Sequence, residues 1–152
     1  MDFITAQHVH VFGQLLLAVF LGSILGIERT LAHRFAGFRT FAMVSLGACG
    51  FTIISVLVAR YAGNPASFDP TRIAGQIVTG IGFLAGGLIV LNKDTVHGLT
   101  TSAGLWVSAG IGMAIGFEFY GVAIGMTVLA VIIFGIFWQL EQKLVGHERE
   151  RK

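Results

Sequence analysis

Five long stretches of the 152-residue chain contain no Asp, Glu, Lys or Arg, and this pattern constrains the fold more than any other feature. A transmembrane helix needs about 20 consecutive apolar residues to cross about 30 Å of hydrocarbon. The stretches are continuously apolar rather than alternating, which excludes the strands of a transmembrane barrel. The sequence therefore predicts an all-α integral membrane protein with about five charge-free spans, within residues 3–27, 40–59, 73–92, 95–117 and 119–140.

The composition agrees with this fold class. Charged residues make up 12% of the chain, whereas soluble domains carry about 25%. We expect a membrane domain at residues 1–140 and a charged cytoplasmic tail at 141–152. The first apolar stretch lacks the basic start and cleavage pattern of a signal peptide, so we expect it to be retained as a span. Within the membrane domain, the spans themselves are predicted at about 9–27, 40–59, 73–92, 98–117 and 119–140.

The basic residues lie in alternate loops. Eight of the ten Lys and Arg residues fall in the first loop, the third loop and the tail, and only Arg60 and Arg72 fall in the second loop. Because basic loops stay on the cytoplasmic side, this contrast predicts an outside N-terminus and an inside C-terminus. The net charge of +2 is too small to suggest a nucleic-acid partner.

Glycine is the strongest packing signal, with 21 residues in the chain. Glycines four residues apart share one helix face and allow close backbone approach. We expect them to pack helices within one bundle, and a homodimer face or a passage lined by backbone stays open as an alternative. The pairs with this spacing are Gly22–Gly26, Gly82–Gly86, Gly112–Gly116 and Gly121–Gly125.

A weak internal repeat is also visible. Residues 37–42 and 98–103 are alike, and each segment opens a span that starts on the cytoplasmic side. This similarity is typical of a parallel repeat of two helical hairpins, which is one known plan of transporters. Chance recurrence of small residues is the alternative.

The charged residues gather at the cytoplasmic rim, so a binding site is expected there. No acidic or basic residue lies near the middle of a span, which argues against a proton-coupled carrier. Two helix N-termini face this side, and helix N-termini attract anions. One hypothesis is an anion or lipid-headgroup site. The simpler alternative is that the threonines cap helices and Glu28 pairs with an arginine. The site would be built from Arg29, Arg39, Thr40, Thr100 and Thr101.

Metal binding and catalysis have little support. Mg²⁺ prefers carboxylate oxygens, yet Asp69 and Glu118 are predicted outside while Glu28 and Asp94 are predicted inside. Asp69 is the one weak candidate ligand. Asp69 or Thr71 could also cap the third span. No acid–base pair or nucleophile motif is evident, so we expect no enzyme and no cofactor, with Mg²⁺ left open.

Five motifs in order resemble the MgtC/SapB family of bacterial inner-membrane proteins. They are GIER at 26–29, AGFRT at 36–40, DPTRIAGQ at 69–76, GIGFLAGG at 80–87 and GLTTSAGLW at 98–106. The resemblance spans about residues 13–137. By motif position, it implies that the family's signature residues are Glu28, Arg29, Arg39, Thr40, Asp69, Arg72, Thr100, Thr101 and Trp106.

The resemblance implies a protein linked to magnesium limitation, acid stress and intracellular survival. The best-known branch is similar to a regulator that binds other membrane proteins, including the ATP synthase, more than to a magnesium pump. That virulence-associated branch continues into a soluble cytoplasmic domain, whereas this chain stops at Lys152. Thr30 also replaces the Gln of many members.

Three functions follow as hypotheses. The first is a non-enzymatic regulator that contacts other membrane proteins. The second is a transporter or channel for a small ion such as Mg²⁺. The third is a structural protein that binds membrane lipids at its basic rim. A homo-oligomer is compatible with each.

Overall fold

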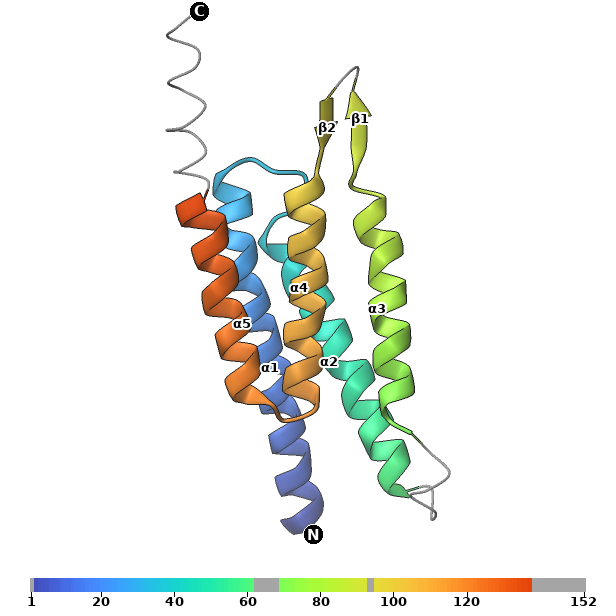
Figure 1. Cartoon of the computed structure of the whole chain (residues 1–152). Coiled ribbons are helices and arrows are strands. Elements are labelled where there is room, and N and C mark those ends of the chain that lie inside the picture. The colour runs from blue at the N-terminus through green and yellow to red at the C-terminus, as the bar shows by residue number, and fades with distance from the viewer. Residues whose placement is uncertain (1, 62–68, 93–94, 138–152) are drawn as a thin grey trace, which may run out of the picture.

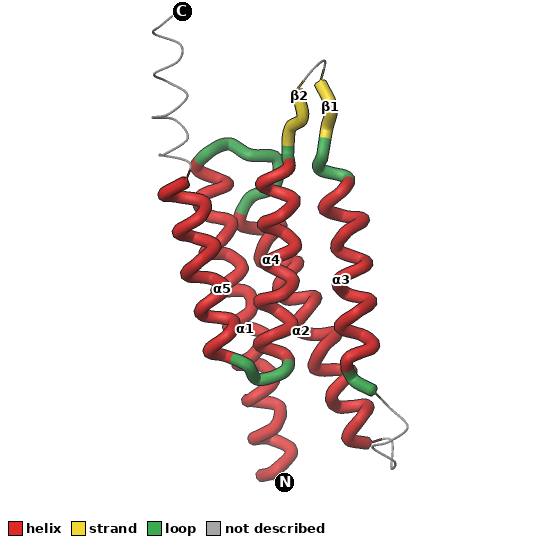
Figure 2. The backbone as a smooth tube through the Cα atoms, viewed as in Figure 1, coloured by secondary structure: helices red, strands yellow, loops and turns green. Residues whose placement is uncertain are grey.

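The computed structural model describes residues 2–61, 69–92 and 95–137 (Figure 1). It is a bundle of five helices with one short β-hairpin, and the helices run alternately up and down (Figure 2). The predicted tail at 141–152, together with Lys93 and Asp94, lies outside the described residues. The elements are α1 (Asp2–Leu31), α2 (Phe38–Tyr61), α3 (Thr71–Gly86), β1 (Val90–Asn92), β2 (Thr95–His97), α4 (Leu99–Gly116) and α5 (Tyr120–Ile132), which continues as a π-helical turn (Ile133–Phe137).

The all-α membrane fold is confirmed. Three helices, α1, α2 and α4, are long and apolar enough to cross a membrane. They also form the centre of the bundle, because α2 packs along both α1 and α4. Many large apolar side chains, such as Phe20 and Phe51, remain exposed on the outside, which is expected where the surrounding solvent is lipid.

Two of the predicted glycine pairs lie in these central contacts. A Cβ at Gly22 would lie 2.7 Å from the Cβ of Ser45, so α1 and α2 touch backbone to backbone. A Cβ at Gly116 would lie 2.6 Å from the Cβ of Thr52, and one at Gly112 would overlap the carbonyl oxygen of Ser45. Gly26 makes the same kind of approach to Phe38 at the start of α2. Glycine therefore sets the spacing of α2 from both neighbours.

The other glycine pairs make no close contact among the described residues. Apart from the helix's own backbone, none of the described atoms lies within 4 Å of a Cβ built at Gly82, Gly86, Gly121 or Gly125. In α3 only Ile81 and Ala85 are buried, so the helix touches the bundle along one narrow edge and turns its glycines outward. The expected packing of these two pairs inside one bundle is not seen in the described part of the chain.

The third helix is shorter than the apolar stretch that predicts it. α3 ends at Gly86 rather than Asn92, and the chain then forms the antiparallel hairpin β1–β2, in which Val90 pairs with His97. Two consecutive glycines weaken the helix at this point, and the β-branched residues that follow favour strands. Gly98 reverses the chain with φ +89° before α4 begins, and a Cβ there would overlap the carbonyl oxygen of Leu88.

The predicted repeat remains a prediction, although its two segments occupy similar positions. α2 begins directly after Gly37, and α4 begins directly after Gly98. The connections differ, because a short loop precedes α2 and the hairpin precedes α4.

Two buried serines give a matched test of polar packing in the core. Ser108 Oγ donates to the carbonyl oxygen of Phe41 at 2.8 Å, joining α4 to α2. Ser45 Oγ is equally buried and has no partner within the described residues. Since an unmet buried hydroxyl costs about 1–3 kcal/mol, Ser45→Ala should hold or raise stability, whereas Ser108→Ala should lower it by about 1 kcal/mol. Thermal unfolding of both variants in one detergent checks this, and an equal loss in both would contradict it.

Candidate anion-binding cavity at the arginine-rich end

The end of the bundle that carries Arg29, Arg34 and Arg39 is called the arginine-rich end, and the C-terminus of α1 provides its first candidate residues. His33 adopts a left-handed conformation (φ 52°), the His33 amide donates to Thr30, and the Arg34 amide donates to the carbonyl oxygen of Arg29 at 2.9 Å. This is the hydrogen-bond pattern of a Schellman motif, which ends a helix and reverses the chain. The Thr30 hydroxyl then accepts the Phe38 amide at 2.9 Å and so caps the start of α2. The short loop between α1 and α2 is therefore tightly defined.

Arg29 is the most unusual side chain at this end, because it is charged and only 3% exposed. Its Nε donates to the carboxylate of Glu28, and its guanidinium lies 4.2 Å from the ring centroid of Phe134 in the π-helical turn. The predicted pairing of Glu28 with a rim arginine is confirmed. The same contacts connect the end of α1 to the end of α5.

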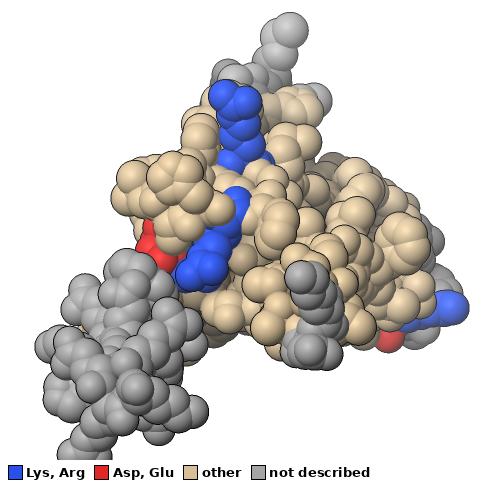
Figure 3. All heavy atoms as spheres, turned by 90° about the horizontal axis from the view of Figure 1, so that it is seen from above, with Lys and Arg blue, Asp and Glu red and all other residues tan. Residues whose placement is uncertain are grey.

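A cavity of about 540 Å³ opens beside Arg29, among the ends of α1 and α5, the hairpin and the start of α4. Figure 3 views this end of the molecule and shows basic side chains on a largely uncharged surface, with acidic atoms beside them and again at one edge of the view. No Asp or Glu lines the cavity within the described part of the chain. Its polar lining residues are Arg29, His33, Arg34, His97, Thr100 and Thr101.

The N-terminus of α4 forms one wall of the cavity. Gly98 precedes the helix, and no side chain of residues 2–61, 69–92 or 95–137 caps it, so the predicted threonine caps are not formed here. The first backbone hydrogen bond of this helix joins the Ser102 amide to the carbonyl oxygen of Gly98 at 2.9 Å. The amides that precede Ser102 in the first turn therefore point out of the helix end. Thr101 is only 3% exposed, and its hydroxyl has no hydrogen-bond partner among the described residues. The wall therefore offers donors to a guest in the cavity.

The predicted five-residue anion site is split by the structure. Arg29, Thr100 and Thr101 share the cavity, but Arg39 and Thr40 do not line it. Arg39 lies over the ring of Phe38, with 5.8 Å from its guanidinium to the ring centroid, and Thr40 lines a different hollow beside α3. Both residues are exposed in the first turn of α2 and lie outside the cavity.

His33, Arg34 and His97 join the cavity and were missed by sequence reasoning. His97 reaches it only because the hairpin brings β2 back to the start of α4. The left-handed conformation of His33 sets the direction of the loop. The sequence signal that could have added His33 and Arg34 to the site is that a helix ends just before them.

Asp69 and Arg72 lie at the opposite end of the bundle, at the start of α3. The Asp69 carboxylate accepts the amide of Thr71 at 2.9 Å and its hydroxyl at 2.7 Å, which holds the turn just before α3. The N-cap of α3 is Pro70, and it makes no side-chain cap hydrogen bond within the described residues, so the predicted capping by Asp69 or Thr71 is not seen. The described residues contain no group of three or more His, Cys, Asp or Glu side chains that could hold a metal ion. A metal at Asp69 would need further ligands from water or from another molecule.

The hydrogen bonds of Asp69 give a pH prediction. The two hydrogen bonds from Thr71 favour the charged form and lower the pKa of the Asp69 carboxyl. Their contribution to stability is therefore fully present above the unfolded-state pKa of about 4, and it disappears as pH falls through the lower folded-state pKa. We expect Asp69→Ala to unfold at a lower temperature than wild type at pH 7 and at the same temperature near pH 2. A difference that persists at low pH would contradict this role, and Arg60→Ala is the control.

Trp106, another predicted signature residue, points out of the bundle. Its side chain is 51% exposed on α4, so it does not pack in the interior. At the end of the bundle where α1 begins, His10 Nε2 lies 3.4 Å from both the Glu118 carboxylate and the Tyr120 hydroxyl. These three were not predicted as a group, because they come from opposite halves of the chain.

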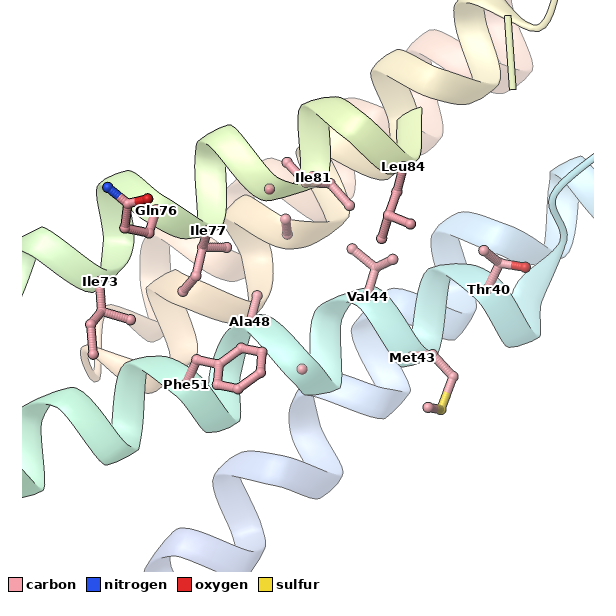
Figure 4. A pocket seen from close by; sticks show the side chains of 13 residues that line it. Thr40, Met43, Val44, Ala48, Phe51, Ile73, Gln76, Ile77, Ile81 and Leu84 are labelled. Carbon is pink, nitrogen blue, oxygen red and sulfur yellow. The ribbon is translucent and has the colours of Figure 1, made fainter. Parts of the chain in front are cut away.

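A second hollow lies along the bundle between α2 and α3. This apolar groove has a volume of about 700 Å³, and Ile73, Ile77 and Leu84 of α3 face Val44 and Ala48 of α2 across it (Figure 4). Two glycines, Gly47 and Gly80, lie one on each wall, and a Cβ added to either would have no atom within 4 Å. Gln76 is the one amide in its lining.

Comparison with known proteins identifies the family. A family model described as the MgtC family matches residues 15–143. The chain is 37% identical over 150 residues to an uncharacterized protein of Haemophilus influenzae, covering 96% of this chain and 63% of that protein. It is 36% identical over 139 residues to the putative magnesium transporter YhiD of Escherichia coli K12, covering 88% and 63% of the two chains.

A third relative is Protein MgtC of Brucella abortus, which is 39% identical over 127 residues, covering 84% of this chain and 51% of that protein. The chain thus spans between half and two thirds of the length of these curated relatives. No solved structure matches the chain. The motifs, the helical membrane fold and these similarities together show that the chain belongs to the MgtC family.

Proposed function

We propose that this chain is a non-enzymatic, multi-pass protein of the bacterial inner membrane that regulates other membrane proteins by binding them. Its role would be linked to magnesium homeostasis, as the name of the Escherichia coli relative suggests. A link to stress adaptation is what the motif resemblance implies. The N-terminus would lie outside and the arginine-rich end inside, in keeping with the positive-inside rule. The observation that carries the proposal is the unfilled groove between α2 and α3.

The groove is suited to a transmembrane helix of another membrane protein. In lipid, helices associate through close packing and hydrogen bonds rather than through the hydrophobic effect, and small residues at the contact favour association. Gly47 and Gly80 leave the backbone of both walls accessible to a guest helix. Because α3 contributes only two buried residues to the bundle, a guest would bury surface that this chain leaves uncovered.

Gln76 adds a requirement that a lipid tail does not meet. Gln76 is exposed at the edge of the groove, and its amide makes no hydrogen bond within the described residues. An amide in an apolar surrounding is costly unless it is hydrogen-bonded, and glutamine can bond across a helix contact. The partner helix should therefore have small residues along the groove and a polar side chain opposite Gln76.

Site-specific photocrosslinking in native membranes tests this proposal. A photoreactive residue at Leu84, which lines the groove, should give a defined adduct with a membrane protein identified by mass spectrometry. A matched position is Val128 on α5, which is similarly exposed and should give none. Gly80→Leu should fill the groove and abolish the Leu84 adduct. An adduct of twice the chain's mass would replace the foreign partner by a second copy, and equal crosslinking from both positions would contradict the proposal.

Magnesium transport is the second candidate, and the name of the Escherichia coli relative favours it. It predicts ion flux through the purified chain, whereas the regulator proposal predicts none. Lipid binding at the basic rim is the third candidate. It predicts stabilisation by anionic lipid that is lost when Arg29 and Arg39 are both replaced.

A further inference from the structure

We propose that the cavity at the arginine-rich end is a binding site for a phosphate group. The site differs from the partner-binding groove in place and in chemistry. It is built by the end of α1, the hairpin, the start of α4 and the π-helical turn after α5. Two features from different parts of the chain converge on it. One is the buried Arg29 at the end of α1, and the other is the N-terminus of α4, whose first turn has no side-chain cap among the described residues and carries the mostly buried Thr101.

Arg29 supplies a fixed positive charge. Glu28 engages only its Nε, and Phe134 supports the face of the guanidinium at 4.2 Å. The terminal nitrogens have no hydrogen-bond partner among the described residues, although the side chain is almost fully buried and lines the cavity. Planar guanidinium groups held in this way are suited to phosphate, because two parallel N–H donors match two phosphate oxygens.

The start of α4 supplies neutral donors to the same space. Among the described residues its first turn has no side-chain cap, and the first helical hydrogen bond is donated by Ser102, so the amides before Ser102 have no helical partner. Gly98, which has no side chain, allows close approach of a guest to the backbone. Helix N-termini of this kind bind anions through their N–H groups and the helix dipole. The buried Thr101 hydroxyl is an additional donor from the same turn, so the helix end is part of a shaped site.

The surroundings select the chemical class of the guest. Arg34, His33 and His97 line the cavity with further basic groups, and no acidic side chain of the described residues does so. A divalent cation is disfavoured in such a site. A volume of about 540 Å³ exceeds the size of one phosphate ion, and the rings of Phe35 and Phe134 line part of the wall. A phosphate attached to a small organic group therefore fits, either as a free phosphomonoester or as a lipid headgroup.

Binding to the purified full chain in zwitterionic nanodiscs tests the proposal and separates the two sources. In one arm, glycerol 3-phosphate and inorganic phosphate are titrated and followed by thermal shift and by ³¹P NMR line broadening. In the other arm, the same protein is placed in nanodiscs that contain phosphatidic acid. Saturable binding in the first arm identifies a soluble ligand, and stabilisation in the second arm alone identifies a lipid headgroup.

The variants are chosen to leave the fold intact. Thr101→Val keeps the shape of the side chain and removes its hydroxyl, and Arg34→Gln changes an exposed side chain. Each should weaken binding about tenfold. Arg39→Gln is the matched control, since this arginine lies at the same end but outside the cavity, and it should leave affinity within twofold. No binding in either arm, or an equal loss in Arg39→Gln and Arg34→Gln, would overturn the proposal.

Discussion

Gly112→Ala should destabilise the folded chain by about 3 kcal/mol, although it adds a single methyl group. The new Cβ would overlap the carbonyl oxygen of Ser45 and lie 3.0 Å from the amide nitrogen of Cys49. Both are backbone atoms of α2, so the clash cannot be relieved by a rotamer change. Forcing extra volume into a close-packed contact costs about 1–3 kcal/mol, and the backbone contact places this variant at the upper end.

Gly82→Ala is the matched control for this result. It adds the same methyl group to a glycine in the middle of another helix, where no atom lies within 4 Å. Alanine is favoured over glycine in a helix by about 0.5–1 kcal/mol, so the control should be neutral or slightly stabilising. The fraction of protein that stays monodisperse after heating in detergent measures both variants. Similar survival of Gly112→Ala and wild type would contradict the close contact of α2 and α4.

Arg29→Leu is expected to have the second largest effect, about 2–3 kcal/mol. The substitution removes the guanidinium from the face of Phe134 and leaves the Glu28 carboxylate without its partner. Breaking a fully buried pair costs about 3–5 kcal/mol, but the Glu28 side chain is 28% exposed and keeps part of its hydration. Thermal unfolding in detergent at pH 7 measures the loss.

A double-mutant cycle identifies the cause. Phe134→Leu alone should cost less than Arg29→Leu, and the two changes together should cost less than their sum, because they remove one shared contact. Arg34→Ala is the control, since its exposed side chain should contribute under about 0.5 kcal/mol. Simple additivity of Arg29→Leu and Phe134→Leu would show that the stacking contributes nothing.

The sequence was sufficient for the parts of the fold that depend on composition. Charge-free stretches mark each of the five helices, and the spacing of Gly22–Gly26 and Gly112–Gly116 marks faces that meet α2. It was not sufficient for the end of α3, because an apolar run does not distinguish a helix from a buried or membrane-facing strand. The four-residue spacing shows that Gly82 and Gly86 lie on the same face of their helix. It does not show whether that face contacts another helix of the bundle or points outward.

The candidate site was predicted in part for a similar reason. The sequence indicated that Arg29 and Thr101 lie at the same end of the bundle, because helix N-termini alternate between the two ends. It could not exclude Arg39, whose direction depends on how α2 is rotated in the bundle. Nor could it reveal the stacking of Phe134 on Arg29, which joins the first helix to the last. Such contacts follow from helix packing and not from local pattern.

Magnesium uptake by the purified chain tests most directly whether it acts by binding or by transport. Liposomes that enclose a Mg²⁺-sensitive dye would contain wild type, Asp69→Ala, Arg39→Ala or no protein, with folding of each sample verified by size-exclusion chromatography after extraction. The regulator account predicts that uptake with every protein equals that of empty liposomes. Uptake above that level with wild type, weakened by Asp69→Ala, would contradict the account and make this chain a magnesium carrier.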